Sequence, residues 1–168
     1  MAHEQHQHAA KNITAQCAVI TLSDTRTRDT DTSGQLIQRL LTEAGHQVAA
    51  YHLIKDDPTE LESLLLDVSS SDAIDTILTN GGTGIARRDQ TINVIEKMID
   101  QPLPGFGELF RMRSWEQIGA AAMLSRATAG ITRGKPIFAM PGSSKAVDLA
   151  MSELILPQLK HILYELRK

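Results

Sequence analysis

Short apolar runs alternate along this chain with stretches whose apolar residues recur every three or four positions. The apolar runs lie at residues 17–22, 48–54 and 76–79. Runs of this length that contain β-branched residues predict buried strands. The stretches that follow them, at residues 36–44, 61–68 and 92–99, place apolar side chains on one face of a helix. The repeated strand–helix order therefore predicts an α/β fold around a mostly parallel sheet with right-handed crossovers.

The second half of the chain predicts a hairpin and further helices. Residues 127–131 and 136–140 form two short apolar runs, and the turn residues at 133–135 join them. A helix is expected at 108–116, and the C-terminal apolar pattern predicts helices that Pro157 kinks or restarts. The whole pattern predicts a three-layer sandwich, in which helices cover both faces of the central sheet, plus a short β-hairpin.

Composition sets the extent of the domain. The chain has 168 residues, 42% of them hydrophobic, which suits a single domain over residues 13–168. Residues 1–12 are polar and predict a flexible N-terminal tail. Its histidines, His3, His6 and His8, are compatible with a metal-binding tail, but disorder fits better because nothing nearby fixes ligand geometry.

Charge and cysteine content narrow the classes of function. The net charge of −3 argues against general nucleic-acid binding, which needs a basic face. The single cysteine, Cys17, cannot form an internal disulfide and begins an apolar run, so we expect it in the core. No stretch is apolar enough to span a membrane and no signal peptide precedes the domain, so we expect a cytoplasmic protein without a membrane partner.

A glycine-rich turn, Gly81-Gly82-Thr83-Gly84, follows the third predicted strand. A strand, a glycine-rich turn and a helix together present backbone N–H groups and a helix N-terminus to an anion. Asp89 lies where a phosphate is expected, and two such anions about 4 Å apart repel by roughly 4 kcal/mol at a dielectric constant of about 20. A divalent cation between them reverses that sign, so the loop predicts a Mg²⁺-assisted phosphate site. The alternative is that Asp89 only caps the helix.

Polar residues follow the first two predicted strands as well. Ser23 and Asp24 come after the first strand, and Asp56 and Asp57 come after the second. Because the carboxyl ends of parallel strands meet at one edge of a sheet, we expect these side chains to converge with Asp89. One of the two adjacent aspartates is expected to cap the next helix, and Asp56 is the candidate second metal ligand.

Later segments add candidate ligand contacts. Phe106 and Glu108 lie in a turn-rich stretch, where Phe106 either walls an aromatic ligand or packs onto the core. A second strand–turn–helix junction follows the last predicted strand and is a second candidate anion site. It comprises Pro141, Gly142, Ser143 and Ser144. Asp31 reads as a helix N-cap, and Trp115 as a packing residue or a subunit contact.

Taken together, these motifs resemble the MogA/MoaB family of molybdenum cofactor biosynthesis proteins from about residue 13 to the end of the chain. The resemblance rests on Ser23-Asp24, Asp56, Gly81-Gly82-Thr83-Gly84, Arg88-Asp89-Gln90-Thr91, Pro104-Gly105-Phe106-Gly107-Glu108 and Pro141-Gly142-Ser143. The stretch from Phe138 to Ser143 and the short C-terminus are more similar to the MoaB branch than to the MogA branch.

The resemblance implies an α/β domain that binds molybdopterin and forms a trimer or a hexamer. Active members of the family adenylylate molybdopterin with MgATP and release pyrophosphate. By the same resemblance, Asp56 and Asp89 are the catalytic residues and the Mg²⁺ ligands. The remaining implied contacts to nucleotide and pterin are Ser23, Asp24, Gly81, Gly82, Thr83, Gly84, Phe106, Glu108, Pro141, Gly142, Ser143 and Ser144.

Two other functions stay open from the sequence. The first is a non-catalytic molybdopterin-binding or scaffold protein, since some members of the MoaB branch lack equivalents of Asp56 or of the Arg88-Asp89 pair. This chain keeps both. The second is a generic flavodoxin-like binder of a nucleotide or a flavin, although the chain offers few aromatic side chains to stack on an isoalloxazine ring.

Overall fold

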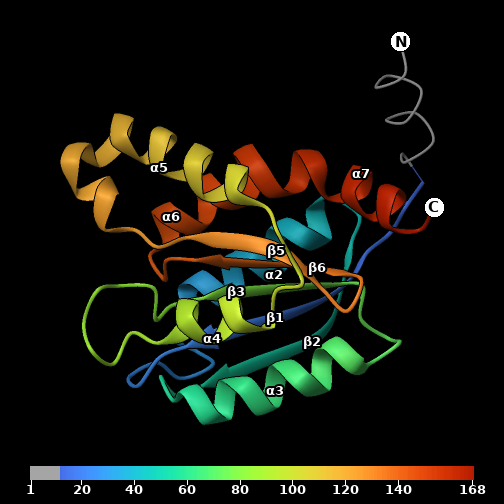
Figure 1. Cartoon of the computed structure of the whole chain (residues 1–168), viewed down its shortest axis with the longest axis horizontal. Helices are drawn as coiled ribbons and strands as arrows, with labels where there is room; N and C mark the ends of the chain where they lie inside the picture. Colours follow the sequence, from blue (N-terminus) through green and yellow to red (C-terminus); the bar gives the residue numbers. More distant parts are fainter. Residues whose placement is uncertain (1–11) are drawn as a thin grey trace.

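A computed structural model describes residues 12–168 as one six-stranded sheet with helices on both faces (Figure 1). Residues 1–11 of the predicted tail, and with them its three histidines, lie outside the described residues. The sheet order is β2-β1-β3-β6-β5-β4. The strands are β1 (Gln16–Leu22), β2 (Gln47–Ile54), β3 (Thr76–Asn80), β4 (Gln101–Pro102), β5 (Thr128–Thr132) and β6 (Lys135–Met140). Strands β2, β1, β3 and β6 run parallel, whereas β5 and β4 run antiparallel at one edge.

The helices form the two outer layers. The helices of one layer share a single core cluster of buried residues. They are α2 (Thr32–Glu43), α5 (Pro104–Ile118), α6 (Ser144–Leu149), the π-helical segment η2 (Ala150–Ile155) and α7 (Leu156–Leu166). The other layer consists of α3 (Pro58–Ser70) and α4 (Thr91–Met98). A 3₁₀ segment, η1 (Gly119–Leu124), links α5 to β5. The predicted three-layer α/β sandwich is therefore confirmed.

The strands alternate their side chains between the two layers. In β1, Val19 packs toward α2 and α5, whereas Ile20 packs toward α3 and α4, and both side chains are fully buried. This explains why β1 is a nearly continuous apolar run rather than an alternating one. Cys17 is also fully buried, as expected, and burial, with a smaller contribution from Asp75, raises the pKa of its thiol to about 12.

Two details differ from the sequence prediction, whereas Pro157 restarts a C-terminal helix as predicted. Helix α5 begins at Pro104 rather than at residue 108, since proline is favoured in the first turn of a helix, where its missing N–H costs nothing. The predicted hairpin is not an addition to the sheet, because β6 pairs with β3 and β5 pairs with β6 inside it. Its turn residues, Arg133 and Gly134, both have positive φ angles. Pro157 lies in the first turn of α7, directly after the π-helical segment.

The parallel strands β1, β2, β3 and β6 end at the same edge of the sheet. The loops after β2, β3 and β6 lie at that edge, and they hold most of the polar residues that the sequence predicts for the site.

Within the described residues, none of the helices has both the length and the apolar character needed to cross a bilayer.

Candidate functional site

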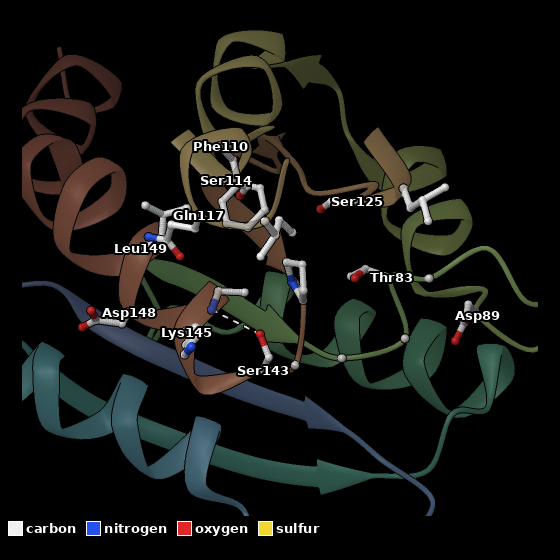
Figure 2. Close-up of a pocket in the computed structure, with 18 residues that line it drawn as sticks. Thr83, Asp89, Phe110, Ser114, Gln117, Ser125, Ser143, Lys145, Asp148 and Leu149 are labelled. Atoms are coloured by element: carbon white, nitrogen blue, oxygen red, sulfur yellow. Dashed lines mark hydrogen bonds between the residues drawn. The ribbon is translucent and has the colours of Figure 1, made fainter. Parts of the chain in front are cut away.

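A cavity of about 970 Å³ opens at the carboxyl ends of β3 and β6 (Figure 2). Its floor is formed by the two predicted glycine loops, and its walls come from α5, the end of η1 and the first turns of α6. The lining residues are Gly81, Gly82, Thr83, Gly84, Asp89, Phe110, Ser114, Gln117, Ile118, Leu124, Ser125, Pro141, Gly142, Ser143, Lys145, Ala146, Asp148 and Leu149. The lining thus combines apolar side chains with polar side chains and exposed glycine backbone, which suits a ligand with an aromatic body and an anionic group.

The two glycine loops pack backbone against backbone at the floor of the cavity. Gly81 and Gly82 have φ angles of +97° and +64°, a region that residues with a Cβ rarely adopt. The Gly81 N–H donates to the Met140 carbonyl at 3.1 Å. A Cβ on Gly142 would lie 3.2 Å from the Gly81 Cα, so the approach depends on glycine. The predicted site residues of both loops therefore share one cavity.

Backbone N–H groups are available in the first of these loops. Among the described residues, the N–H groups of Gly82, Thr83, Gly84 and Ile85 donate to no acceptor. Gly82, Thr83 and Gly84 are buried or half-buried, where N–H groups are normally paired with protein, water or ligand, whereas Ile85 is exposed. A run of N–H donors at the end of a strand is a site for an anion such as phosphate.

Asp89 stands at the wall of this cavity and does not cap the helix that follows it. The N-cap of α4 is Gln90, and its side chain makes no capping hydrogen bond. Instead Asp89 Oδ2 accepts from the Ala86 N–H at 2.9 Å, so the carboxylate closes a turn inside the loop. A Cβ on Gly84 would lie 2.6 Å from Asp89 Oδ2. The carboxylate thus lies directly against the glycine turn.

The two adjacent aspartates after β2 have different roles. Asp57 caps α3, with Oδ1 accepting from the N–H groups of Thr59 and Glu60 at 2.9 and 2.8 Å. Asp56 does not cap: its N–H donates to Asp24 Oδ1 at 3.1 Å, and its own Oδ1 is buried without a hydrogen-bond partner. The same Oδ1 would lie 2.7 Å from a Cβ on Gly82. Asp56 is absent from the lining of the main cavity and lies in a narrow recess with Arg88 and Thr91.

The electrostatics around Asp56 favour a cation. Burial and the nearby charges of Asp24 and Asp89 raise its pKa above the ordinary value, and Arg88 partly opposes this. Arg88 pairs with Asp24 at 3.6 Å. Within residues 12–168, no group of three or more His, Cys, Asp or Glu side chains could hold a metal ion alone. Mg²⁺ commonly takes only one or two carboxylates and completes its shell with substrate phosphates and water, so Asp56 and Asp89 fit it.

Some predicted contact residues lie away from the cavity. Phe106 is buried and packs on Phe110 and Phe138, with ring centroids 6.3 and 5.4 Å away, so the core alternative describes its position. Glu108 is exposed on α5 and is absent from the lining. Ser143 lines the cavity and caps α6 through the Ala146 N–H, at 3.2 Å.

Two further serines also stay outside the cavity. Ser144 Oγ lies 3.3 Å from Thr32 Oγ1, where the first turn of α6 meets α2. Ser23 Oγ accepts from the N–H groups of Thr25 and Arg26 at 3.3 and 3.1 Å and shapes the loop after β1. Both hydroxyls therefore support the loops around the cavity, and neither contributes to its lining.

A polar network around the buried Asp31, which no sequence motif predicted, lies beneath the second glycine loop. Arg26 Nη2 donates to the Gly142 carbonyl at 2.9 Å, and Nη1 pairs with Asp31 Oδ1 at 3.3 Å. Asp31 is fully buried and accepts from the Tyr51 hydroxyl at 2.6 Å. Burial opposes its charge, but hydrogen bonds, led by those from Thr21 and Tyr51, outweigh burial and lower the pKa of Asp31. Asp31 is therefore the predicted N-cap, and it also anchors Arg26 beneath the second glycine loop.

Comparisons with known proteins agree with this site. The family described as a probable molybdopterin binding domain matches residues 18–161. Molybdenum cofactor biosynthesis protein B of Bacillus subtilis is 49% identical over 169 residues, which is 100% of this chain and 99% of that protein. The Bacillus cereus protein of the same name is 49% identical over 166 residues, or 98% of this chain and 97% of that protein.

Solved structures give the same result. A crystal structure of molybdenum cofactor biosynthesis protein B has a TM-score of 0.90 and 51% identity, and covers 92% of this chain and 97% of that one. The tungsten cofactor synthesizing protein MoaB from Pyrococcus furiosus has a TM-score of 0.82 and 40% identity, and covers 92% and 98%. The chain therefore belongs to the MogA/MoaB family of molybdenum cofactor biosynthesis proteins.

Proposed function

We propose that this chain binds molybdopterin and adenylylates it with MgATP, giving adenylyl-molybdopterin and pyrophosphate in the cytoplasm, where ATP is available. One observation carries the proposal. The loop after β3 has N–H groups at residues 82–85 that donate to no acceptor in the described chain, and two carboxylates, Asp56 and Asp89, lie against it. Family membership supports the pterin as the partner. It also argues against the alternative function, a generic flavodoxin-like binder of a nucleotide or a flavin.

The reaction needs positioning and charge neutralisation more than proton transfer. An oxygen of the terminal phosphate of molybdopterin attacks the α-phosphorus of ATP, and the bond from that phosphorus to the bridging oxygen breaks. Pyrophosphate leaves with the bond's electron pair. The attacking phosphate is already ionised, so no general base is required, which fits a cavity without a histidine in its lining. The N–H groups of residues 82–85 hold phosphate oxygens in line for the displacement.

Asp56 and Asp89 would hold Mg²⁺ at this site. The buried and unpartnered Oδ1 of Asp56 is the observation that fits a cation. Bound there, Mg²⁺ supplies positive charge between the carboxylates and the ATP phosphates and so offsets their repulsion. Lys145 lines the other side of the cavity and is a second cation for an anionic ligand (Figure 2).

Pyrophosphate release tests the reaction directly. The purified chain is incubated with molybdopterin and MgATP, and adenylyl-molybdopterin is quantified by liquid chromatography. We expect equal amounts of pyrophosphate and adenylylated pterin, and none without magnesium. Binding of molybdopterin without pyrophosphate release would overturn adenylylation and support the alternative, a non-catalytic binding or scaffold protein of the same family.

Replacing Asp56 with asparagine is expected to raise the melting temperature of the metal-free protein by a few degrees while it lowers adenylyl transfer. The pKa of Asp56 in the folded protein is raised above 3.8, so folding favours the protonated carboxyl. This contribution to the free energy of unfolding is fully present below pH 3.8 and is lost as the pH rises through the folded-state pKa. At pH 7 the charged group therefore destabilises the metal-free fold. Thermal unfolding of both proteins between pH 4 and pH 8 measures the effect.

The gap in melting temperature between Asp56→Asn and wild type should widen with pH, and about 10 mM magnesium should stabilise the wild type but not Asp56→Asn. Asp57→Asn is the matched control, because the adjacent carboxylate caps α3 and its asparagine variant keeps an acceptor for that cap. A melting temperature below wild type at every pH would contradict the electrostatic role of Asp56.

The proposal includes a homo-oligomer, a trimer or a hexamer, formed through α5. Apolar side chains occur on all sides of this helix: Phe106 and Phe110 pack inward, while Met112, Trp115 and Ile118 are 56%, 62% and 55% exposed. Met112, Trp115 and Ile118 recur every three residues and so lie on one side of the helix. Large exposed apolar side chains gathered in this way are typical of a protein–protein contact, so a second copy of the chain is the expected cover.

Trp115→Glu is expected to convert the oligomer to a monomer, because a charge in the centre of an apolar interface is strongly unfavourable. Multi-angle light scattering after size exclusion measures the mass against the 18.4 kDa of one chain. Leu66→Glu is the control: Leu66 is 41% exposed but lies on α3, in the opposite layer. An unchanged mass for Trp115→Glu would place the interface elsewhere.

A further inference from the structure

Arg126 connects the segment before β5 to the loop that carries Asp89. Its Nε donates to the Gly84 carbonyl at 2.9 Å and to the Thr83 carbonyl at 3.4 Å. Its Nη2 donates to the Asp89 carbonyl, and Nη1 donates to Asn93 Oδ1 at 2.8 Å. One half-buried guanidinium thus bridges the glycine turn, the carboxyl-bearing residue and the first turns of α4.

These contacts fix which way the peptide groups of the loop point. The C=O and N–H of a trans peptide point in opposite directions. The carbonyls of Thr83 and Gly84 face Arg126, so the N–H groups of Gly84 and Ile85 in the same peptide units face away from it. These two N–H groups are among those that find no acceptor in the described chain. The guanidinium thereby separates the acceptors of the loop from its donors.

Apart from the Gly81 N–H bond to the Met140 carbonyl at the start of the loop and the exposed Arg88–Asp24 pair, loop residues 81–90 have little other long-range support. They contain no helix or strand, and residues 85–88 are exposed. Their internal hydrogen bonds are short-range, such as the Asp89 N–H to the Ala86 carbonyl at 3.0 Å. Arg126 provides a contact from more than thirty residues away in the chain. The planar fork of arginine can serve these spread acceptors at once, whereas the compact ammonium of lysine cannot.

We propose that Arg126 is a positioning residue, which holds the glycine loop with its N–H donors and Asp89 arranged for a nucleotide phosphate. The consequence for ATP rests on the proposed function, whereas the ordering of the loop does not. The ordering can therefore be tested without any substrate.

Trypsin provides the substrate-free test, because Arg87 and Arg88 are exposed within the loop itself. Under native conditions, cleavage after these residues requires the loop to loosen. Arg126→Lys keeps the charge and the tryptic site but loses the fork, so we expect cleavage at residues 87 and 88 to become at least about tenfold faster. Mass spectrometry of the fragments assigns each cut.

Arg133→Lys is the matched control, since Arg133 also bridges distant segments but donates to Ser70 Oγ, on α3. Its cleavage rate at the loop should equal that of wild type. Where the wild type shows adenylyl transfer, Arg126→Lys should also raise the KM for ATP about tenfold or more with a smaller change in kcat. A merely structural role would leave that KM unchanged.

The outcomes separate this inference from the proposed function. Faster cleavage confined to the loop supports the positioning role even if the wild type shows no transfer, a result in which only the proposed reaction fails. Unchanged cleavage at residues 87 and 88 overturns the role, and so does an equal increase at all tryptic sites, which would indicate general destabilisation. A loosened loop with an unchanged KM for ATP in an active enzyme also overturns it.

Discussion

Asp89→Asn is expected to reduce adenylyl transfer by at least about 100-fold with little change in the melting temperature. The asparagine side-chain oxygen still accepts from the Ala86 N–H, which Asp89 Oδ2 holds at 2.9 Å, so the turn is retained. The negative charge that is proposed to face Mg²⁺ is lost, and removing a single electrostatic group from an active site typically costs about 10²–10³ in kcat. Liquid chromatography of the adenylylated pterin, with circular dichroism for the fold, measures both effects.

The same assay on Asp57→Asn gives the control, since that carboxylate caps α3 outside the cavity. Its turnover should stay within about twofold of wild type, because it touches no reacting group. If Asp89→Asn turned over like wild type, the carboxylate would only brace its own loop, and its assignment as a catalytic residue would be wrong.

Gly81→Ala is expected to destabilise the fold by about 3 kcal/mol or more and to remove activity. Two independent effects combine at this position. The φ angle of +97° is unfavourable for any residue with a Cβ. The added Cβ would also lie 2.2 Å from the carbonyl oxygen of Leu22, a backbone atom at the end of a central strand that cannot move cheaply. Urea denaturation measures the free energy of unfolding.

Gly105→Ala separates this effect from a general intolerance of glycine replacement. Gly105 lies in the first turn of α5, and a Cβ there meets no atom within 4 Å. Alanine is the better helix former, so the variant should be as stable as wild type or more stable by up to about 1 kcal/mol. Equal stability losses in both variants would contradict the steric account of the glycine loop.

The fold could be predicted because its local patterns agree with its long-range structure. Central strands such as β1 are buried on both faces, and a continuous apolar run is what such a strand requires. The strand–helix alternation then fixes the parallel pairing. The extent of α5 was missed, because Pro104 and its glycine neighbours are typical of turns as well as of first helical turns.

The candidate site was predicted where a motif lies in one continuous segment. Residues 81–84 and 141–143 line the cavity as expected, and so does Asp89. The sequence could not assign roles to Asp56 and Asp57, because either residue can cap a helix that begins with proline. The structure distinguishes them by the capping bonds of Asp57 and the unpartnered oxygen of Asp56.

Residues that act across the fold carried no sequence signal. Arg26 and Arg126 reach carbonyl oxygens of loops distant in the chain, at Gly142 and Gly84 respectively. Arginines in loops are usually solvated, so nothing local distinguishes these two from Arg28 or Arg87. Phe106 was ambiguous for a related reason, since only the positions of its ring neighbours show that it packs into the core.

We propose that acidic side chains are tolerated against the glycine loop because a divalent cation would join them to a nucleotide phosphate. A crystal structure of the chain grown with manganese and a non-hydrolysable ATP analogue, with anomalous data, tests it most directly. The expected result is an anomalous peak bonded to oxygens of Asp56, Asp89 and the analogue, with phosphate oxygens on the N–H groups of residues 82–85. An analogue bound elsewhere, or a pocket without manganese while Asp89 contacts only Ala86, would contradict the claim.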